Sequence, residues 1–220
     1  QIPWILEPEC RVCGRHIPCN DCLRRTRHYL YCNRSAVRYD AVMKQWLARF
    51  KYRGDERLTP VLAEMLHYGY QHLLRDLHLT ADLIDAITYV PLSMEREEER
   101  GFNQAERLAR GLAEKVNIPV FSLVKRQRHS EKQSYLSRKD RMASLHNTFD
   151  INAEELKRLR QFAKKSSSRT NGERHTSGIA LYNIIIVDDI YTTGNTLNQN
   201  ARVILNHLPA RCLGLTWARS

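Results

Sequence analysis

Residues 184–197 read Ile-Ile-Ile-Val-Asp-Asp-Ile-Tyr-Thr-Thr-Gly-Asn-Thr-Leu, and this stretch decides the fold class. Its four leading β-branched residues predict a strand that is buried on both faces. Two carboxylates, Asp188 and Asp189, follow at the end of the strand. A short Thr/Gly loop then leads into a helical pattern of apolar residues that reaches Leu208. In a parallel sheet, the order strand, loop, helix puts a ligand at the carboxyl edge.

The loop after the two carboxylates has the composition of a phosphate-binding loop. It consists of Thr192, Thr193, Gly194, Asn195 and Thr196. Its backbone N–H groups and hydroxyls donate hydrogen bonds, its glycine lets the backbone close on an anion, and the following helix adds its positive end. The carboxylates repel a phosphate, so they suit hydroxyl groups or a divalent cation nearby. The stretch therefore predicts a sugar phosphate with free hydroxyl groups as the ligand.

The same stretch resembles the phosphoribosyl-pyrophosphate (PRPP) loop of type I phosphoribosyltransferases, in which an acidic pair and T-T-G-x-T follow a hydrophobic strand. The resemblance implies that Asp188 and Asp189 hold the ribose hydroxyls, with Mg²⁺ bound alongside PRPP, and that residues 192–196 hold the 5′-phosphate. An ordinary strand–helix turn that carries two Asp residues is the simpler alternative. A receiver domain is excluded, because its acidic pair lies near the start of the domain, whereas here only about thirty residues follow the pair.

The composition is that of one medium-sized domain with a small appendage, since the chain has 220 residues of which 42% are hydrophobic. It contains no run of eighteen apolar residues, so we expect no transmembrane segment, and its first residues lead us to expect no signal peptide. The net charge of +11 predicts attraction to polyanions. PRPP and nucleic acids are both polyanions, so the charge alone does not choose between them.

Four of the six cysteines lie close together near the N-terminus in two C-x-x-C motifs, formed by Cys10, Cys13, Cys19 and Cys22. Four thiolates are the tetrahedral ligand set of structural Zn²⁺, and the crowding indicates a metal site in a reducing cytoplasm rather than a disulfide framework. The alternatives are a metal-free cluster of reduced thiols, a site completed by Cys32 or His16, and a motif that pairs with cysteines upstream of this sequence. Cys212 lies in an apolar strand, which places it in the core.

A second strand and turn precede the first stretch in the sequence. Residues 86–90 predict a strand, Leu92 and Ser93 follow it, and a charged run ends at Arg100. This turn lies where a parallel sheet would place a pyrophosphate pocket, and type I phosphoribosyltransferases contact pyrophosphate with the equivalent loop. Arg100 would supply a bidentate phosphate contact. Its alternative role is an exposed ion pair with a neighbouring glutamate.

Residues 126–141 are polar and basic, and include Lys132 and Gln133. They match the place where type I enzymes carry a flexible loop that closes over PRPP and excludes water. A surface loop without function is the alternative. Residues 153–177 predict a basic insertion, suited to a solvated segment or to a phosphate backbone. Further strands are expected at residues 34–39, 120–124 and 210–218, and helices at 41–50, 58–74, 154–162 and around Leu108.

The motifs V-P-L-S at residues 90–93 and R-G-F-N-Q-A at residues 100–105, followed by the phosphate loop, look like the ComF (ComFC) family of late competence proteins. F-K-Y-R-G-D at residues 50–55 and the cysteine motifs also resemble that family. The resemblance implies an α/β protein with a type I phosphoribosyltransferase-like fold, a mostly parallel sheet flanked by helices. It divides the chain into a zinc-knuckle segment (1–35) and a phosphoribosyltransferase-like domain (36–220).

The same resemblance implies a role in DNA uptake during natural transformation. The protein would act in the cytoplasm or peripherally at the membrane uptake machinery, with a competence helicase and other uptake proteins as partners.

Two functions of different classes are compatible with these motifs. The first is an enzyme that binds PRPP with Mg²⁺ and transfers its phosphoribosyl group with release of pyrophosphate. Thr192 stands where 6-oxopurine enzymes carry an Asp, so we expect no such purine activity. The second is a catalytically inactive fold that serves as a single-stranded-DNA-binding or scaffold module of the uptake machinery.

Overall fold

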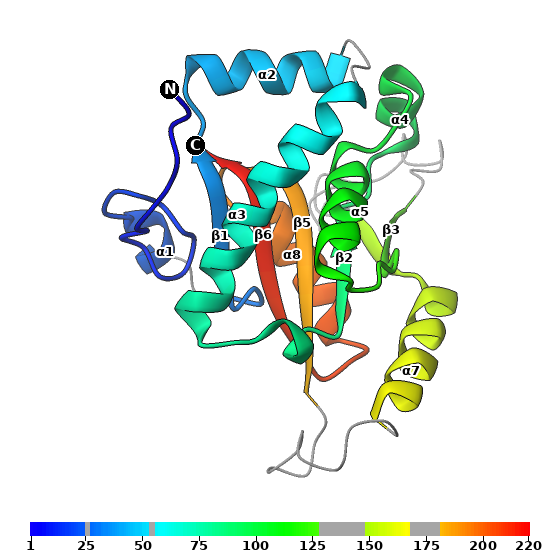
Figure 1. Cartoon of the computed structure of the whole chain (residues 1–220). Coiled ribbons are helices and arrows are strands. Elements are labelled where there is room, and N and C mark those ends of the chain that lie inside the picture. Colours follow the sequence, from blue (N-terminus) through cyan, green and yellow to red (C-terminus); the bar gives the residue numbers. More distant parts are fainter. Residues whose placement is uncertain (25–26, 53–55, 128–147, 168–180) are drawn as a thin grey trace, which may run out of the picture.

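A parallel four-stranded sheet forms the centre of the protein (Figure 1). Its strands, in spatial order, are β1 (Cys32–Arg38), β6 (Ala210–Arg219), β5 (Tyr182–Tyr191) and β2 (Ala86–Tyr89). Every neighbouring pair in this sheet runs parallel. The computed structural model describes the chain except for residues 25–26, 53–55, 128–147 and 168–180.

Helices cover both faces of the sheet (Figure 1). α3 (Thr59–Leu77) and α5 (Gln104–Val116) lie on one face, where α3 packs on β1 and β6 and α5 on β2 and β5. α8 (Asn195–Leu205) covers the opposite face. Residues 184–187 of β5 are therefore completely buried. This arrangement confirms the expected α/β class and the mostly parallel sheet flanked by helices.

The other elements lie around this frame. They are α1 (Asn20–Arg24), α2 (Ala41–Tyr52), α4 (Met94–Arg100), α7 (Ala153–Ser167), the antiparallel pair β3 (Val124–Arg126) and β4 (Phe149–Ile151), and 3₁₀ turns at Glu56–Leu58 and Ala81–Leu83. α2 lies beyond the carboxyl ends of the strands (Figure 1). No helix in the described part of the chain is long and apolar enough to span a membrane.

The strand expected at residues 120–124 forms only in part. Val120 makes an isolated parallel bridge with Ile87 of β2, and β3 begins at Val124. Between them, the N–H of Leu123 donates to the hydroxyl of Thr88 at 3.3 Å rather than continuing a ladder. The chain thus leaves the central sheet at this point and pairs with β4 instead.

The N-terminal segment packs along the edge of β1. Trp4 forms an antiparallel bridge with Val37, and the N–H of Asn33 donates to the carbonyl of Val12 at 2.7 Å. The side-chain amide of Asn33 donates to the carbonyl of Cys13 at 3.2 Å. β1 itself spans the expected boundary between residues 35 and 36. The division into two units stays a prediction.

Candidate functional site

A cavity of about 1000 Å³ opens at the carboxyl edge of the sheet, where β5 ends and α8 begins. Its lining includes most of the predicted site residues, namely Asp188, Asp189, Thr192, Asn195, Thr196, Leu92 and Arg100. Among the described residues, Ser93, Thr193 and Gly194 are not part of the lining. Lys132 and Gln133 of the predicted flexible loop lie outside the described residues. Two turns that are far apart in the sequence thus meet at one cavity, as the parallel sheet requires.

The acidic pair lies in β5, which continues past it to Tyr191. Asp188 is half-buried and aligns with Thr216 of β6, while Asp189 is 8% exposed. Burial raises the pKa of the Asp188 carboxyl well above its usual range, and the adjacent charge of Asp189 raises it further. A pair in this state attracts a proton or another cation.

Lys51, near the C-terminal end of α2, supplies one such cation. Its Nζ lies 2.5 Å from Oδ2 of Asp189, and both side chains are largely buried. The sequence analysis included Lys51 only in the family-like motif F-K-Y-R-G-D and did not place it beside the acidic pair. The sequence shows cations and rings together in this motif, but only the fold brings its Lys51 to the cavity.

The phosphate loop is shorter than the sequence predicts, because α8 begins at Asn195. Asn195 and Thr196 therefore form the first turn of that helix, whose N-terminus favours anions. Gly194 precedes it with φ +73°, a left-handed conformation that favours glycine. A Cβ at Gly194 would lie 2.0 Å from the hydroxyl oxygen of Tyr191. The position therefore requires glycine for both its conformation and its space.

The second turn contributes Leu92 and Arg100 to the cavity. The charged run after it forms helix α4, and Ser93 caps this helix by accepting the N–H of Arg96 at 3.4 Å. Nη1 of Arg100 donates to Oε1 of Gln104 at 2.9 Å. That contact fixes one nitrogen of a guanidinium that carries five N–H donors in all.

Further basic and aromatic residues complete the lining, and one of them, Arg126, is the first residue of the range 126–141 that was predicted to close over PRPP. Besides Lys51 and Arg100, the cationic lining residues are Arg27, Arg96, Arg126 and Arg202. The guanidinium of Arg126 lies 5.8 Å from the ring centroid of Phe149. Burial lowers the pKa of Arg126, and the nearby charge of Arg96 lowers it further, so positive charges lie close together here. Such a cavity attracts a ligand with several negative charges.

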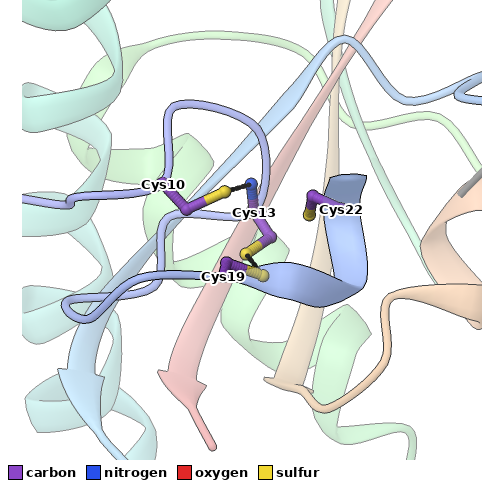
Figure 2. Close-up of side chains that lie close together, drawn as sticks. All are labelled: Cys10, Cys13, Cys19 and Cys22. Carbon is purple, nitrogen blue, oxygen red and sulfur yellow. Dashed lines mark hydrogen bonds between the residues drawn. The ribbon is translucent and has the colours of Figure 1, made fainter. Parts of the chain in front are cut away.

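The four predicted metal ligands come together in the N-terminal segment (Figure 2). The sulfur atoms of Cys10, Cys13, Cys19 and Cys22 all lie within 4.8 Å of one another. Sγ of Cys13 is 3.6 Å from Sγ of Cys19. Four sulfurs that bind one Zn²⁺ at about 2.3 Å are roughly 3.8 Å apart, so this geometry fits a tetrahedral metal ion. Within the described residues, neither Cys32 nor His16 belongs to the group.

The remaining cysteines have the structural role expected of buried thiols. Cys212 is 1% exposed in β6, and burial raises its pKa to about 12. Cys32 is 3% exposed in β1, and burial raises its pKa to about 11. Both stay protonated and apolar at neutral pH, in agreement with the prediction for Cys212.

The fold and the cavity together define the class of protein: an α/β protein with a type I phosphoribosyltransferase-like fold and an N-terminal cluster of four cysteines that could hold a metal ion. Comparison with known proteins gives the family. The chain is 33% identical over 207 residues to competence protein ComFC of Bacillus subtilis, which covers 89% of this chain and 71% of the relative. The chain belongs to this ComF (ComFC) family of competence proteins.

Other relatives extend the comparison. Competence protein F of Haemophilus influenzae is 28% identical over 205 residues, which cover 90% of this chain and 78% of the relative. DNA utilization protein YhgH of Escherichia coli K12 is 26% identical over 204 residues, with the same two coverages of 90% and 78%. No protein-family model matches the chain.

Proposed function

We propose that this protein binds PRPP together with Mg²⁺ in the cavity at the carboxyl edge and acts in DNA uptake during natural transformation. The observation that carries the proposal is the position of the acidic pair. Asp188 and Asp189 lie directly before a Thr/Gly loop and a helix N-terminus, and all three line one cavity. Carboxylates that accept hydrogen bonds from hydroxyl groups, together with a phosphate site in the same cavity, suit a phosphorylated sugar.

Different residues of the cavity bind different groups of PRPP. The 5′-phosphate lies on the loop and the first turn of α8, at Thr192, Asn195 and Thr196. The ribose hydroxyls lie on Asp188 and Asp189. The pyrophosphate extends towards Leu92 and Arg100, with the other cations of the lining nearby.

Carboxylate oxygens suit Mg²⁺, which binds to proteins through one or two carboxylates and to the phosphates of a substrate. The ion, when bound, would neutralise charge on the pyrophosphate. Lys51 competes with Mg²⁺ for the acidic pair, because its ammonium already pairs with Asp189. Binding of PRPP with Mg²⁺ therefore requires Lys51 to release Asp189 or to share it.

A structural zinc ion in the four-cysteine cluster completes the proposal. The role in DNA uptake rests on the relatives, whose names are competence and DNA utilization proteins. Transfer of the phosphoribosyl group to an acceptor, with release of pyrophosphate, would follow from PRPP binding. Its acceptor would approach the cavity from the side of Phe149 and Arg126.

Calorimetric titration with PRPP, with and without Mg²⁺, tests the proposal. We expect Mg²⁺-dependent binding by the wild type and its loss in the double variant Asp188→Asn with Asp189→Asn. Asp85→Asn serves as the control. Asp85 directly precedes β2, at the end of this strand away from the cavity, and does not line it. Equal binding by the wild type and the double variant would refute the site, and no binding by a folded, zinc-loaded wild type would refute the ligand.

Binding of single-stranded DNA is the second candidate, favoured by the arginines and aromatic rings of the same lining. The backbone N–H of Tyr29 donates to Oδ1 of Asn198 at 2.8 Å, which holds the segment with Arg27 against α8, the helix that carries Arg202. Phosphate contacts make DNA affinity fall with salt, and each one contributes about 0.7 to the slope for a single strand.

Arg202→Gln should therefore lower the affinity for a single-stranded oligonucleotide and reduce its salt slope by about 0.7. The control is Lys115→Gln, which removes the same charge from α5, where Lys115 pairs with Glu64. An affinity that is independent of salt would contradict this function. So would an equal effect of the two variants.

A further inference from the structure

Arg219, the last residue of β6, lies between the phosphate loop and the four-cysteine cluster. Its side chain is buried, with 2% exposure. Nη1 donates to the carbonyl of Tyr191 at 3.0 Å and to that of Thr192 at 2.9 Å. On the other side, Nη2 lies 3.6 Å from Sγ of Cys13. One guanidinium thus contacts the first residue of the loop and one of the predicted metal ligands.

The guanidinium of Arg219 is a buried cation, so the groups around it must compensate its charge. Besides the two loop carbonyls, its contacts are the carbonyl of Ser220 and the ring of Tyr191, whose centroid lies 4.6 Å from its Cζ. Among the described residues, no aspartate or glutamate side chain pairs with it, and Sγ of Cys13 is the side-chain atom that can offer it negative charge. The four thiolates around one Zn²⁺ carry two negative charges beyond those that the ion neutralises, and Cys13 brings them to hydrogen-bond distance.

We propose that Arg219 is a positioning residue that couples metal binding at the four-cysteine cluster to the conformation of the phosphate loop. The metal-loaded cluster holds the guanidinium, and the guanidinium holds the carbonyls of Tyr191 and Thr192. Metal loss releases the Cys13 side chain from its fixed place among the four sulfurs, so its contact with Arg219 weakens and the loop loses an anchor. The part of the proposal that concerns PRPP rests on the proposed function, whereas the coupling itself does not.

The packing around Tyr191 explains how a change at Arg219 would reach the residues that bind phosphate. The ring of Tyr191 lies under Arg219 and fills the space in which a side chain at Gly194 would have to sit. The backbone on both sides is fixed, since the N–H of Ser220 donates to the carbonyl of Tyr191 at 3.1 Å and the N–H of Tyr39 to that of Arg219 at 2.8 Å. The side chain of Arg219 is therefore the adjustable part of the connection. By linkage, a ligand that orders the loop must also strengthen metal retention.

Backbone amide hydrogen exchange of the peptide that spans residues 190–197 tests the coupling without PRPP. In the wild type, removal of zinc by a chelator should speed exchange of this peptide by about tenfold or more, because the loop opens locally. The peptide that covers β2 should exchange at an unchanged rate. In Arg219→Gln the loop peptide should exchange fast whether zinc is present or not, and zinc should dissociate faster than from the wild type.

Arg34→Gln is the matched control. Arg34 is also a buried arginine beside the cysteine segment, where Nη1 donates to the carbonyl of Arg11 at 3.0 Å, but its charge is paired with Asp76 at 2.6 Å. This variant should keep the zinc-dependent exchange of the loop. The coupling is refuted if wild-type exchange does not respond to zinc, if Arg219→Gln responds as the wild type does, or if chelation speeds exchange throughout the sheet.

A second arm concerns the ligand. PRPP should bind more weakly to the zinc-free wild type than to the zinc-loaded one, and Arg219→Gln should remove this difference. If PRPP fails to bind to the loaded wild type, the proposed function fails while the exchange result still decides the coupling. Equal PRPP affinity with and without zinc, in a protein whose loop exchange responds to zinc, would overturn the extension to phosphate binding. The wild-type measurements need no variant, so a folding defect in Arg219→Gln leaves the test decisive.

Discussion

Nζ of Lys51 lies 2.5 Å from Oδ2 of Asp189, which joins the end of α2 to the acidic pair of β5. Lys51→Met would leave a largely buried carboxylate without its cation, and we expect the free energy of unfolding to fall by about 1–3 kcal/mol. Asp189→Asn in addition should restore part of this loss, since the unpaired charge is then gone. Urea unfolding of the two single variants and the double variant measures the coupling, and strictly additive losses would contradict a direct pair.

The pH dependence of stability follows from Asp188, whose pKa burial raises above its usual range. In the unfolded chain the pKa of an Asp carboxyl is about 3.9. Because the native pKa of Asp188 is higher, the native state binds this proton more tightly than the unfolded chain does. Asp188 therefore stabilises the fold fully below about pH 3.9, and its contribution falls as pH rises towards the native pKa, at up to about 1.4 kcal/mol per pH unit.

Asp188→Asn cannot ionise, so its stability relative to the wild type should rise between about pH 5 and pH 8. Thermal or urea unfolding of both proteins at several pH values measures the difference. The two neighbouring charges, Asp189 and Lys51, are present in both proteins, so the difference isolates Asp188. A constant difference across this range would show that its native pKa is ordinary.

Comparison of Gly194 with Gly101 separates two effects of an alanine substitution, namely the cost of a positive φ and the steric clash of the added Cβ. Both have positive φ, +73° and +78°, so alanine at either position meets the left-handed penalty of about 1–2 kcal/mol. A Cβ at Gly101 meets nothing within 4 Å, whereas at Gly194 it collides with the ring of Tyr191. Gly194→Ala should lose about 1–3 kcal/mol more than Gly101→Ala in urea unfolding, because the ring must move. Equal losses would mean that Tyr191 shifts freely.

The parts of the structure that sequence could predict are those that are local in the chain. The strand with Ile184, the acidic pair and the helix after Gly194 follow one another directly, so periodicity and turn chemistry were sufficient. The two C-x-x-C motifs are also close in sequence, and their four sulfurs meet as expected. Helices α2, α3 and α5 formed where apolar periodicity indicated them.

The parts that sequence missed depend on tertiary contacts. Lys51 and Arg219 are ordinary cations in their own segments, and only strand order and helix packing bring Lys51 to the acidic pair and Arg219 to the phosphate loop. The incomplete strand around Val120 has the same cause. Its β-branched residues favour a strand, but Thr88 and the pairing with β4 draw the chain out of the sheet. Propensity describes a segment, whereas its partners decide the pairing.

The metal content of cysteine variants should distinguish Cys13 from the buried thiols outside the cluster. Cys13→Ser should lower bound zinc from about one ion per chain to well below stoichiometry, since a serine hydroxyl does not ionise to replace a thiolate ligand. Cys32→Ala is the control, because Cys32 is buried in β1 and stands outside the cluster. Elemental analysis after gel filtration gives the stoichiometry, and circular dichroism shows whether the sheet is retained. Zinc retained in Cys13→Ser, or lost equally in Cys32→Ala, would contradict a site built on the four clustered sulfurs.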